Sequence, residues 1–162
     1  MLLPPSLQQA AEDTLEACRK AGLTVATAES CTGGLVAAAL TAIAGSSAVV
    51  DRGFVTYSNQ AKAEMLGVPP DLITAHGAVS EAVARAMAEG ALAHSQADRS
   101  VAITGIAGPG GGSADKPVGT VHFAAARRDG ATIAQAHLFQ GDRDAVRLQA
   151  AITALDLLKN PI

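Results

Sequence analysis

The most constraining feature of this sequence is the segment at residues 28–34, AESCTGG, which links a predicted strand to a predicted helix. Residues 23–27 before it are β-branched and apolar, which predicts a buried strand. Residues 35–43 after it are apolar and alanine-rich, which predicts a helix. Ser30 therefore lies in a tight turn at the positive end of a helix dipole, which suits an activated nucleophile or a bound anion. Alternatively, Ser30 or Thr32 only caps the helix.

The composition predicts one domain, residues 1–162, with a core of small apolar side chains. Almost half of the residues (49%) are apolar but only 2% are aromatic, so alanine, valine, leucine and isoleucine must fill the core. The formal net charge of -3 gives no electrostatic support for binding nucleic acid. We therefore predict no nucleic-acid partner.

The sequence carries no sign of a membrane span, a secretory signal or a metal site. No apolar run reaches the roughly 18 residues of a membrane span, and residues 1–5 lack a basic region. The two cysteines, Cys18 and Cys31, match neither a disulfide framework nor a metal pattern, and the histidines lack metal spacing. These features predict a cytoplasmic protein without membrane contact, structural metal or cofactor.

Helix and strand patterns alternate along the chain. Predicted helices cover residues 6–20, 35–43, 61–66 and 80–94, with a closing helix that begins at Asp142 or Asp144. Predicted strands cover residues 23–27, 53–57, 99–104, 118–126 and 132–139, the last two as a hairpin. Ser6 and Gln9 form a candidate capping box. The alternation predicts an α/β fold, a three-layer α/β/α sandwich with a mixed sheet.

Polar residues gather where the predicted strands end, at Ser30, at residues 57–62 and at residues 104–105. Because ligands bind beyond the carboxyl ends of strands in α/β sheets, these loops are expected to share one crevice. There the Ser30 hydroxyl could attack an acyl group, Lys62 made neutral by burial could take its proton, and Tyr57 could relay or hold it. The alternative is that Tyr57 only ends a strand and Lys62 is a solvated lysine.

The glycine-rich run at residues 108–112 does not match a nucleotide fingerprint, because it leads into a strand and lacks the Gly-Lys-Ser/Thr of a Walker loop. Its amides could cradle a phosphate, or it is a plain surface loop. Arg143 lies in the first turn of the last helix, where a cation opposes the dipole. That position indicates either anion binding or pairing with Asp142 or Asp144.

Seven motifs, in order, resemble the C-terminal domain of the CinA (competence/damage-inducible) proteins over about residues 6–158. They are residues 28–34 (AESCTGG), 45–47 (GSS), 53–59 (GFVTYSN), 76–80 (HGAVS), 104–109 (TGIAGP), 116–120 (KPVGT) and 141–143 (GDR). Many members carry a further N-terminal domain, so the resemblance extends to the amidase half alone. It implies hydrolysis of the carboxamide of nicotinamide mononucleotide, giving nicotinate mononucleotide and ammonia. The alternative is a non-catalytic nucleotide- or partner-binding domain of a competence or DNA-damage system.

The resemblance also implies which residues form the site. The family's serine–lysine pair falls on Ser30 and Lys62, and its tyrosine on Tyr57. The substrate-binding residues are then Glu29, Thr32, Gly33, Ser47, Asn59, Thr104, Gly105, Gly108 and Arg143. The partner is a small nucleotide, with no metal or cofactor, and an alanine-rich domain with helices to bury predicts a homodimer or larger homo-oligomer.

Two aspects of substrate binding stay open in the sequence. The oxyanion that forms during acyl transfer could lie against backbone N–H groups near residues 32–33 or near residues 104–105. The substrate phosphate could be held by the amides of residues 108–113 together with Arg143, whose planar guanidinium suits a phosphate. Lys116 is the rival source of positive charge for the phosphate.

The nucleophile also has an alternative, since Cys31, next to Ser30, is a rival.

Overall fold

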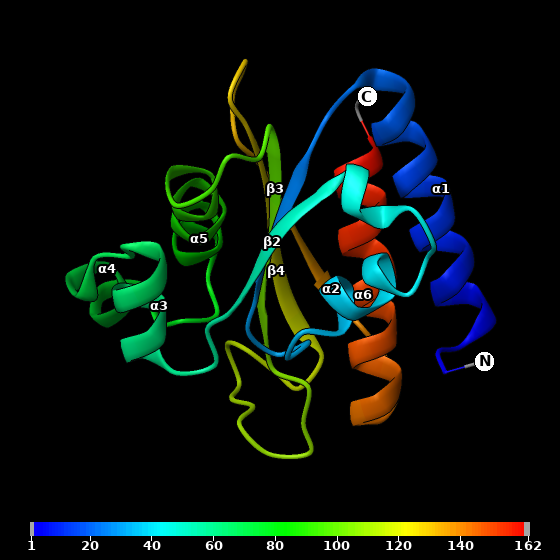
Figure 1. Ribbon diagram of the computed structural model, residues 1–162. Coiled ribbons are helices and arrows are strands. Elements are labelled where there is room, and N and C mark those ends of the chain that lie inside the picture. Colours follow the sequence, from blue (N-terminus) through cyan, green and yellow to red (C-terminus); the bar gives the residue numbers. More distant parts are fainter. Residues whose placement is uncertain (1, 161–162) are drawn as a thin grey trace.

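The computed structural model describes residues 2–160, which fold into six α-helices, one 3-10 helix and five strands (Figure 1). The helices are α1 (Pro5–Ala21), α2 (Leu35–Thr41), α3 (Asn59–Leu66), α4 (Pro70–His76), α5 (Glu81–Ala93) and α6 (Arg143–Lys159), with the 3-10 helix η1 at Ser46–Ala48. The strands are β1 (Val25–Glu29), β2 (Val50–Val55), β3 (Arg99–Gly105), β4 (Thr120–Arg127) and β5 (Ile133–Leu138).

The strands form one mixed sheet in the order β2-β1-β3-β4-β5. β1 is parallel to β2 and β3, whereas β4 is antiparallel to β3 and forms the predicted hairpin with β5. The carboxyl ends of β1, β2 and β3 therefore meet at one edge, which is where ligands bind in sheets of this kind. The loop that follows β3 extends beyond this edge, at the bottom of Figure 1.

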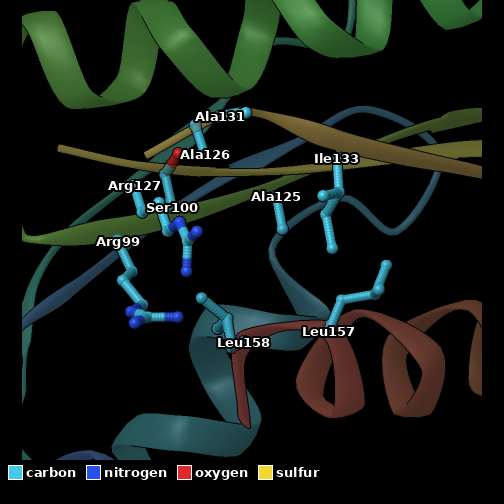
Figure 2. Close-up of a pocket in the computed structure, with 9 residues that line it drawn as sticks. All are labelled: Arg99, Ser100, Ala125, Ala126, Arg127, Ala131, Ile133, Leu157 and Leu158. Atoms are coloured by element: carbon cyan, nitrogen blue, oxygen red, sulfur yellow. The ribbon is translucent and has the colours of Figure 1, made fainter. Parts of the chain in front are cut away.

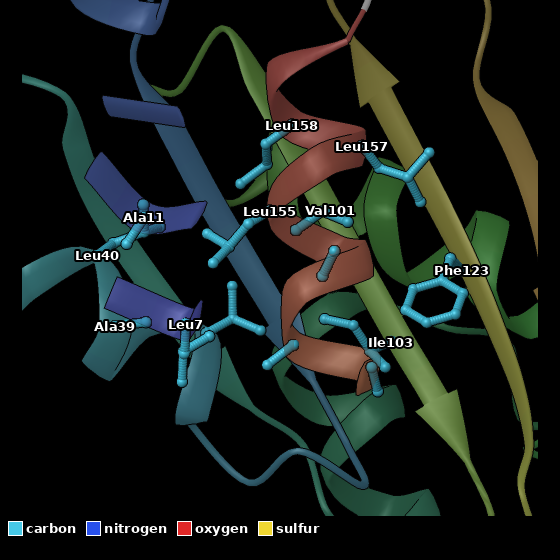
Figure 3. Close-up of a cluster of buried hydrophobic side chains, with 14 of the residues drawn as sticks. Leu7, Ala11, Ala39, Leu40, Val101, Ile103, Phe123, Leu155, Leu157 and Leu158 are labelled. Atoms are coloured by element: carbon cyan, nitrogen blue, oxygen red, sulfur yellow. The ribbon is translucent and has the colours of Figure 1, made fainter. Parts of the chain in front are cut away.

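Helices cover both faces of the sheet, with α1, α2 and α6 on one side and α3, α4 and α5 on the other (Figure 1). The α6 side is packed with larger apolar side chains, several of which are drawn in Figure 3. They include Leu7, Leu155, Val101, Ile103 and Phe123. The predicted three-layer α/β/α sandwich with a mixed sheet is confirmed.

The sheet face toward α5 is lined mainly by alanine. The members of this layer are Ala26, Ala28, Ala102, Ala124 and Ala126. Small side chains allow α5 to lie close to the sheet, and Gly90 of α5 lets α3 approach in turn. A Cβ atom at Gly90 would lie 2.0 Å from the carbonyl oxygen of Leu66, so only glycine fits there. This packing holds α3, which carries Lys62, beside the sheet.

The structure corrects several predicted boundaries by two or three residues. β1 covers Val25–Glu29 rather than residues 23–27, and β2 covers Val50–Val55 rather than residues 53–57. Pairing of β1 with β3 continues to Glu29 opposite Ile103, so Glu29 belongs to the sheet and not to the turn.

The structure also differs from the sequence-based expectations at the starts of two helices. α4 was not predicted, although it begins at Pro70, and proline is common at the first position of a helix. The capping box at Ser6 and Gln9 is wrong, because α1 begins at Pro5 and has Pro4 as its cap without a side-chain hydrogen bond. Among residues 2–160, no helix combines the length and apolar character that crossing a bilayer requires.

Candidate active site

The turn after β1 is built around the carboxylate of Glu29, which is completely buried. Its Oε1 accepts hydrogen bonds from the Thr32 hydroxyl (2.6 Å) and the Val36 amide (2.9 Å), and its Oε2 accepts one from the Ala37 amide (3.1 Å). Glu29 therefore accepts hydrogen bonds from the free N–H groups in the first turn of α2. The N-cap residue, Gly34, has no side chain that could do this. The alternative that the side chain of Ser30 or Thr32 caps the helix is therefore wrong, since Gly34 is the N-cap and the Thr32 hydroxyl donates to Glu29.

Two glycines and one arginine fix the path of this turn. Gly33 and Gly34 have φ angles of +59° and +103°, a region that other residues rarely adopt. Arg147 of α6 donates from Nε to the carbonyl of Cys31 (3.2 Å) and from a terminal nitrogen to the carbonyl of Thr32 (3.1 Å). The peptide groups that follow Cys31 and Thr32 are thus held in place from another layer of the fold.

Ser30 and Lys62 are brought together across the edge of the sheet. The Nζ of Lys62 lies 3.0 Å from the Oγ of Ser30 and donates to the carbonyl of Thr56 at 2.8 Å. Lys62 is only 1% exposed, and no carboxylate lies within 4 Å of its amine among residues 2–160. The reading of Lys62 as a solvated surface lysine is therefore wrong.

Burial changes the acid–base chemistry of this pair. It lowers the pKa of Lys62 below the ordinary lysine value, because a buried ammonium loses its hydration. A neutral amine at this position can accept the hydroxyl proton of Ser30. Burial acts in the opposite direction on the neighbouring thiol and raises the pKa of Cys31 to about 11, which disfavours the nucleophilic thiolate.

Ser30 and Lys62 open into a cavity of about 290 Å³ at the carboxyl edge of the sheet. Eight of the twelve predicted site residues line it, namely Ser30, Tyr57, Asn59, Lys62, Thr104, Gly105, Gly108 and Arg143. The other four, Glu29, Thr32, Gly33 and Ser47, do not. Glu29 and Thr32 bind each other beneath the turn, whereas Ser47 lies in η1, which precedes β2 and is at the opposite end of the sheet.

Arg143 and Tyr57 form the open side of the cavity. Arg143 donates to the carbonyl of Gly108 (2.7 Å) and to the hydroxyl of Tyr57 (3.2 Å). The alternative, pairing of Arg143 with Asp142 or Asp144, is wrong, because no carboxylate lies within 4 Å of its guanidinium among residues 2–160 and Asp142 instead accepts the Ala145 amide and caps α6. Arg143 therefore presents a guanidinium group to the cavity, beside the glycine-rich loop.

Tyr57 and Lys116 do not have the contacts that their predicted roles require. Tyr57 is 63% exposed, and its hydroxyl binds Arg143 rather than Ser30 or Lys62 within the described residues. A proton relay through Tyr57 therefore lacks a hydrogen-bonded path. The amine of Lys116 donates to the carbonyl of His76 at the end of α4 (2.8 Å), away from the lining of the cavity.

Sequence reasoning missed Arg147 and the carbonyl of Thr56. Arg147 lies more than a hundred residues from the turn that it holds, and no local motif marks it. Its spacing of four residues from Arg143, about one helical turn, was the available signal. Within residues 2–160, no group of three or more histidine, cysteine, aspartate or glutamate side chains is arranged to hold a metal ion.

Comparison with known proteins identifies relatives that match most of the chain. The chain is 57% identical over 152 residues to nicotinamide-nucleotide amidohydrolase PncC of Escherichia coli (strain K12), which covers 94% of this chain and 92% of that protein. It is also 59% identical over 138 residues to a CinA-like protein of Anaeromyxobacter dehalogenans, where the match covers 85% of this chain but only 34% of that longer protein.

Solved structures show the same fold. The competence/damage inducible protein CihA of Agrobacterium tumefaciens superposes with a TM-score of 0.95 at 52% identity, covering 98% of this chain and 96% of that one. A CinA superfamily protein of Escherichia coli gives a TM-score of 0.90 at 37% identity, covering 98% and 92%. The family model described as the CinA C-terminal domain matches residues 7–162. The chain therefore belongs to the family of CinA C-terminal domains.

Proposed function

We propose that this protein is an amidohydrolase that converts nicotinamide mononucleotide and water to nicotinate mononucleotide and ammonia. The observation that carries this proposal is the buried amine of Lys62, 3.0 Å from the hydroxyl of Ser30 in an open cavity. The 57% identity to a protein named nicotinamide-nucleotide amidohydrolase supports the choice of substrate. A binding domain alone would have no use for a desolvated lysine next to a serine, since burying an amine is costly.

The reaction would proceed in two acyl-transfer steps. Ser30 Oγ attacks the carboxamide carbon while its proton passes to the neutral amine of Lys62. Lys62 then gives this proton to the departing nitrogen, so that ammonia leaves and a nicotinoyl ester of Ser30 forms. A water molecule repeats the attack with Lys62 as base, and the ester breaks to free the carboxylate and restore Ser30.

The oxyanion of each tetrahedral intermediate needs N–H donors close to Ser30. The Gly33 amide is engaged, because it donates to the Ser30 carbonyl (3.0 Å). The amides of Cys31 and Thr32 donate to no oxygen within residues 2–160, and they directly follow the nucleophile. We therefore favour these two amides, in a turn whose carbonyls Arg147 holds.

The phosphate of the substrate is proposed to bind on the open side of the cavity. Arg143 faces this side together with the backbone of Gly108, Gly110 and Gly111. A guanidinium and loop amides are both suited to a phosphate. Binding energy from this remote group would position the carboxamide against Ser30.

The proposed activity is tested by incubating the purified protein with nicotinamide mononucleotide and measuring ammonia and nicotinate mononucleotide. We expect both products in equal amounts, and neither with the Ser30→Ala variant. Binding of the nucleotide without product would support the non-catalytic alternative and reject the amidohydrolase.

The predicted homodimer or larger homo-oligomer has one structural support. The outer edge of β5, Ile133–Leu138, carries no charged residue, although natural edge strands commonly use charges to prevent pairing. Ile133 and Leu138 are also exposed. Light scattering of the protein as it elutes from a size-exclusion column tests the predicted oligomer. Cell fractionation tests the cytoplasmic location that the sequence predicts.

A further inference from the structure

A second cavity, of about 60 Å³, lies between the sheet and the last turn of α6 (Figure 2). Aliphatic side chains form much of its wall, including Ile133 of β5 and Leu157 and Leu158 of α6. Two arginines, Arg99 and Arg127, also line it. A small, largely apolar cavity with two guanidinium groups is an unusual combination that calls for a physical reason.

The two arginines lie directly opposite each other in the antiparallel pair of β3 and β4. Like charges at such cross-strand positions destabilise a sheet. Water screens part of this repulsion, because the Arg127 side chain is 37% exposed, but no close carboxylate offsets it within residues 2–160. Arg127 Nε is 3.9 Å from a carboxylate oxygen of Asp129, whose side chain is 80% exposed, and Arg99 has no carboxylate within 4 Å.

Arg99 has a second unsatisfied feature. Its Nε is buried and has no hydrogen-bond acceptor among the described residues. Buried N–H donors nearly always have an acceptor, because losing water without a replacement is costly. An anion between the two guanidinium groups would supply this acceptor and would also relieve the repulsion between Arg99 and Arg127.

The cavity is separate from the candidate active site. Arg99 begins β3 and Gly105 ends it, so the two sites are about 20 Å apart along the strand at ~3.3 Å per residue. None of the residues that line one cavity lines the other. Whatever binds near Arg99 is therefore not the reacting group of the proposed amide hydrolysis.

We propose that this second cavity binds a small organic carboxylate, with its charged group between Arg99 and Arg127 and a short branched aliphatic chain against Ile133, Leu157 and Leu158. The planar fork of arginine matches the two oxygens of a carboxylate. The aliphatic walls favour an apolar chain over a fully hydrated anion. A volume of about 60 Å³ has room for about four to six water-sized groups, which fits a four-carbon acid such as isobutyrate. This proposal does not depend on the proposed enzymatic function.

The test is a titration of the ¹⁵N-labelled protein with isobutyrate, followed through the Nε–Hε signals of its arginine side chains. At constant ionic strength we expect saturable shifts of the signals of Arg99 and Arg127, and weaker binding of inorganic phosphate. Arg99→Gln and Arg127→Gln should each weaken isobutyrate binding at least about tenfold, the scale of one charged hydrogen bond. Arg19→Gln is the matched control, because Arg19 is paired with Glu16 on the surface of α1.

A wall variant keeps the test decisive if an arginine variant does not fold. Ile133→Ser should weaken the binding of isobutyrate and leave the binding of phosphate unchanged, because it alters only the apolar side. The proposal is overturned if isobutyrate and phosphate give equal, non-saturating shifts. It is also overturned if folded Arg99→Gln and Arg127→Gln proteins bind isobutyrate as the unchanged protein does. The arginines would then serve only the carboxyl end of α6.

Discussion

The candidate active site has two unlike halves. The buried half consists of Ser30, which is 8% exposed, and Lys62, which is 1% exposed. The open half consists of Tyr57 and Arg143, both on the surface. Burial takes water from an amine that must be neutral to act as a base. Exposure keeps a guanidinium charged and reachable for a phosphate that arrives from solution.

Under the proposed function, this difference assigns the chemistry to the buried half and phosphate binding to the open half of one cavity. Changes in the buried half should lower kcat with any substrate that carries the carboxamide. Changes in the open half should affect only substrates that carry the phosphate. Each of the following substitutions is expected to fall on one side of this division.

The largest effect is expected in the buried half. Ser30→Ala and Lys62→Met should each lower kcat at least about a hundredfold, because each removes a partner of the proton transfer. Steady-state release of ammonia measures this. Cys31→Ala is the control and should keep most of the activity, since the raised pKa of Cys31 disfavours its thiolate. Near-normal turnover of Lys62→Met would show that Lys62 is not the base.

The next effect concerns the support beneath the buried half. Arg147→Ala should lower kcat between about ten- and a hundredfold, because the turn that carries Ser30 loses two hydrogen bonds from α6 and small displacements of a nucleophile are costly. KM should change less than about twofold, since Arg147 does not line the cavity. Arg19→Ala is the surface control. An equal change in KM and kcat would instead indicate a general loss of structure.

The pH dependence reports directly on Lys62. Only the deprotonated amine accepts a proton, so kcat/KM should rise about tenfold per pH unit below the pKa of Lys62 and level off above it. Because burial lowers this pKa, the plateau should begin below the ordinary lysine pKa of 10.5. The pH at which kcat/KM levels off should be the same with nicotinamide mononucleotide and with its phosphate-free riboside. A rise that continues beyond pH 10.5 would contradict a desolvated lysine base.

The open half is tested by Arg143→Ala. Loss of a charged phosphate contact should lower kcat/KM for nicotinamide mononucleotide at least about tenfold. Use of the riboside should change much less, because it has no phosphate to hold. Arg143→Lys keeps the charge but not the planar fork, so its kcat/KM for nicotinamide mononucleotide should lie between the values of the unchanged protein and of Arg143→Ala. Equal losses on both substrates would make Arg143 a structural residue that holds the loop at Gly108.

The sequence predicted the features of this site that depend on local pattern. The strand, turn and helix around residues 28–34 placed Ser30 correctly, and alternating strands and helices predicted the sandwich. The side-chain partners depended on packing between distant segments. The carboxylate of Glu29 could have pointed into the crevice, and only the extension of β1 by pairing with β3 turns it under α2.

Tertiary contacts also decided what the sequence left open. Lys62 lies on α3, which packs against α5 where Gly90 leaves room for Leu66, and its amine is buried against Ser30 and Thr56 of other segments. The opposition of Arg99 and Arg127 depends on the register between β3 and β4, which no local pattern specifies. The same is true of Tyr57, whose partner Arg143 lies 86 residues away and arrives with α6. The position of the Tyr57 hydroxyl therefore depends on tertiary packing.

Tyr57→Phe gives the smallest expected effect and the sharpest test of the division. The substitution keeps the ring but removes the hydroxyl that accepts a hydrogen bond from Arg143 (3.2 Å). Arg143 retains its shorter bond to the carbonyl of Gly108 (2.7 Å), so its guanidinium stays at the cavity. We expect kcat/KM for nicotinamide mononucleotide to fall about fivefold or less, because the lost bond lies at the exposed surface, where water can replace the Tyr57 hydroxyl, and Arg143 keeps its charge.

Use of the riboside by Tyr57→Phe should be unchanged, since the hydroxyl of Tyr57 has no hydrogen bond to Ser30 or Lys62 within the described residues. If Tyr57 instead relays the proton, the variant should lose at least about a hundredfold in kcat on both substrates, as a lost acid–base partner does. Comparing the two substrates therefore assigns Tyr57 to one half of the site. A small loss confined to the mononucleotide places it with Arg143, and a large loss on both places it with Lys62.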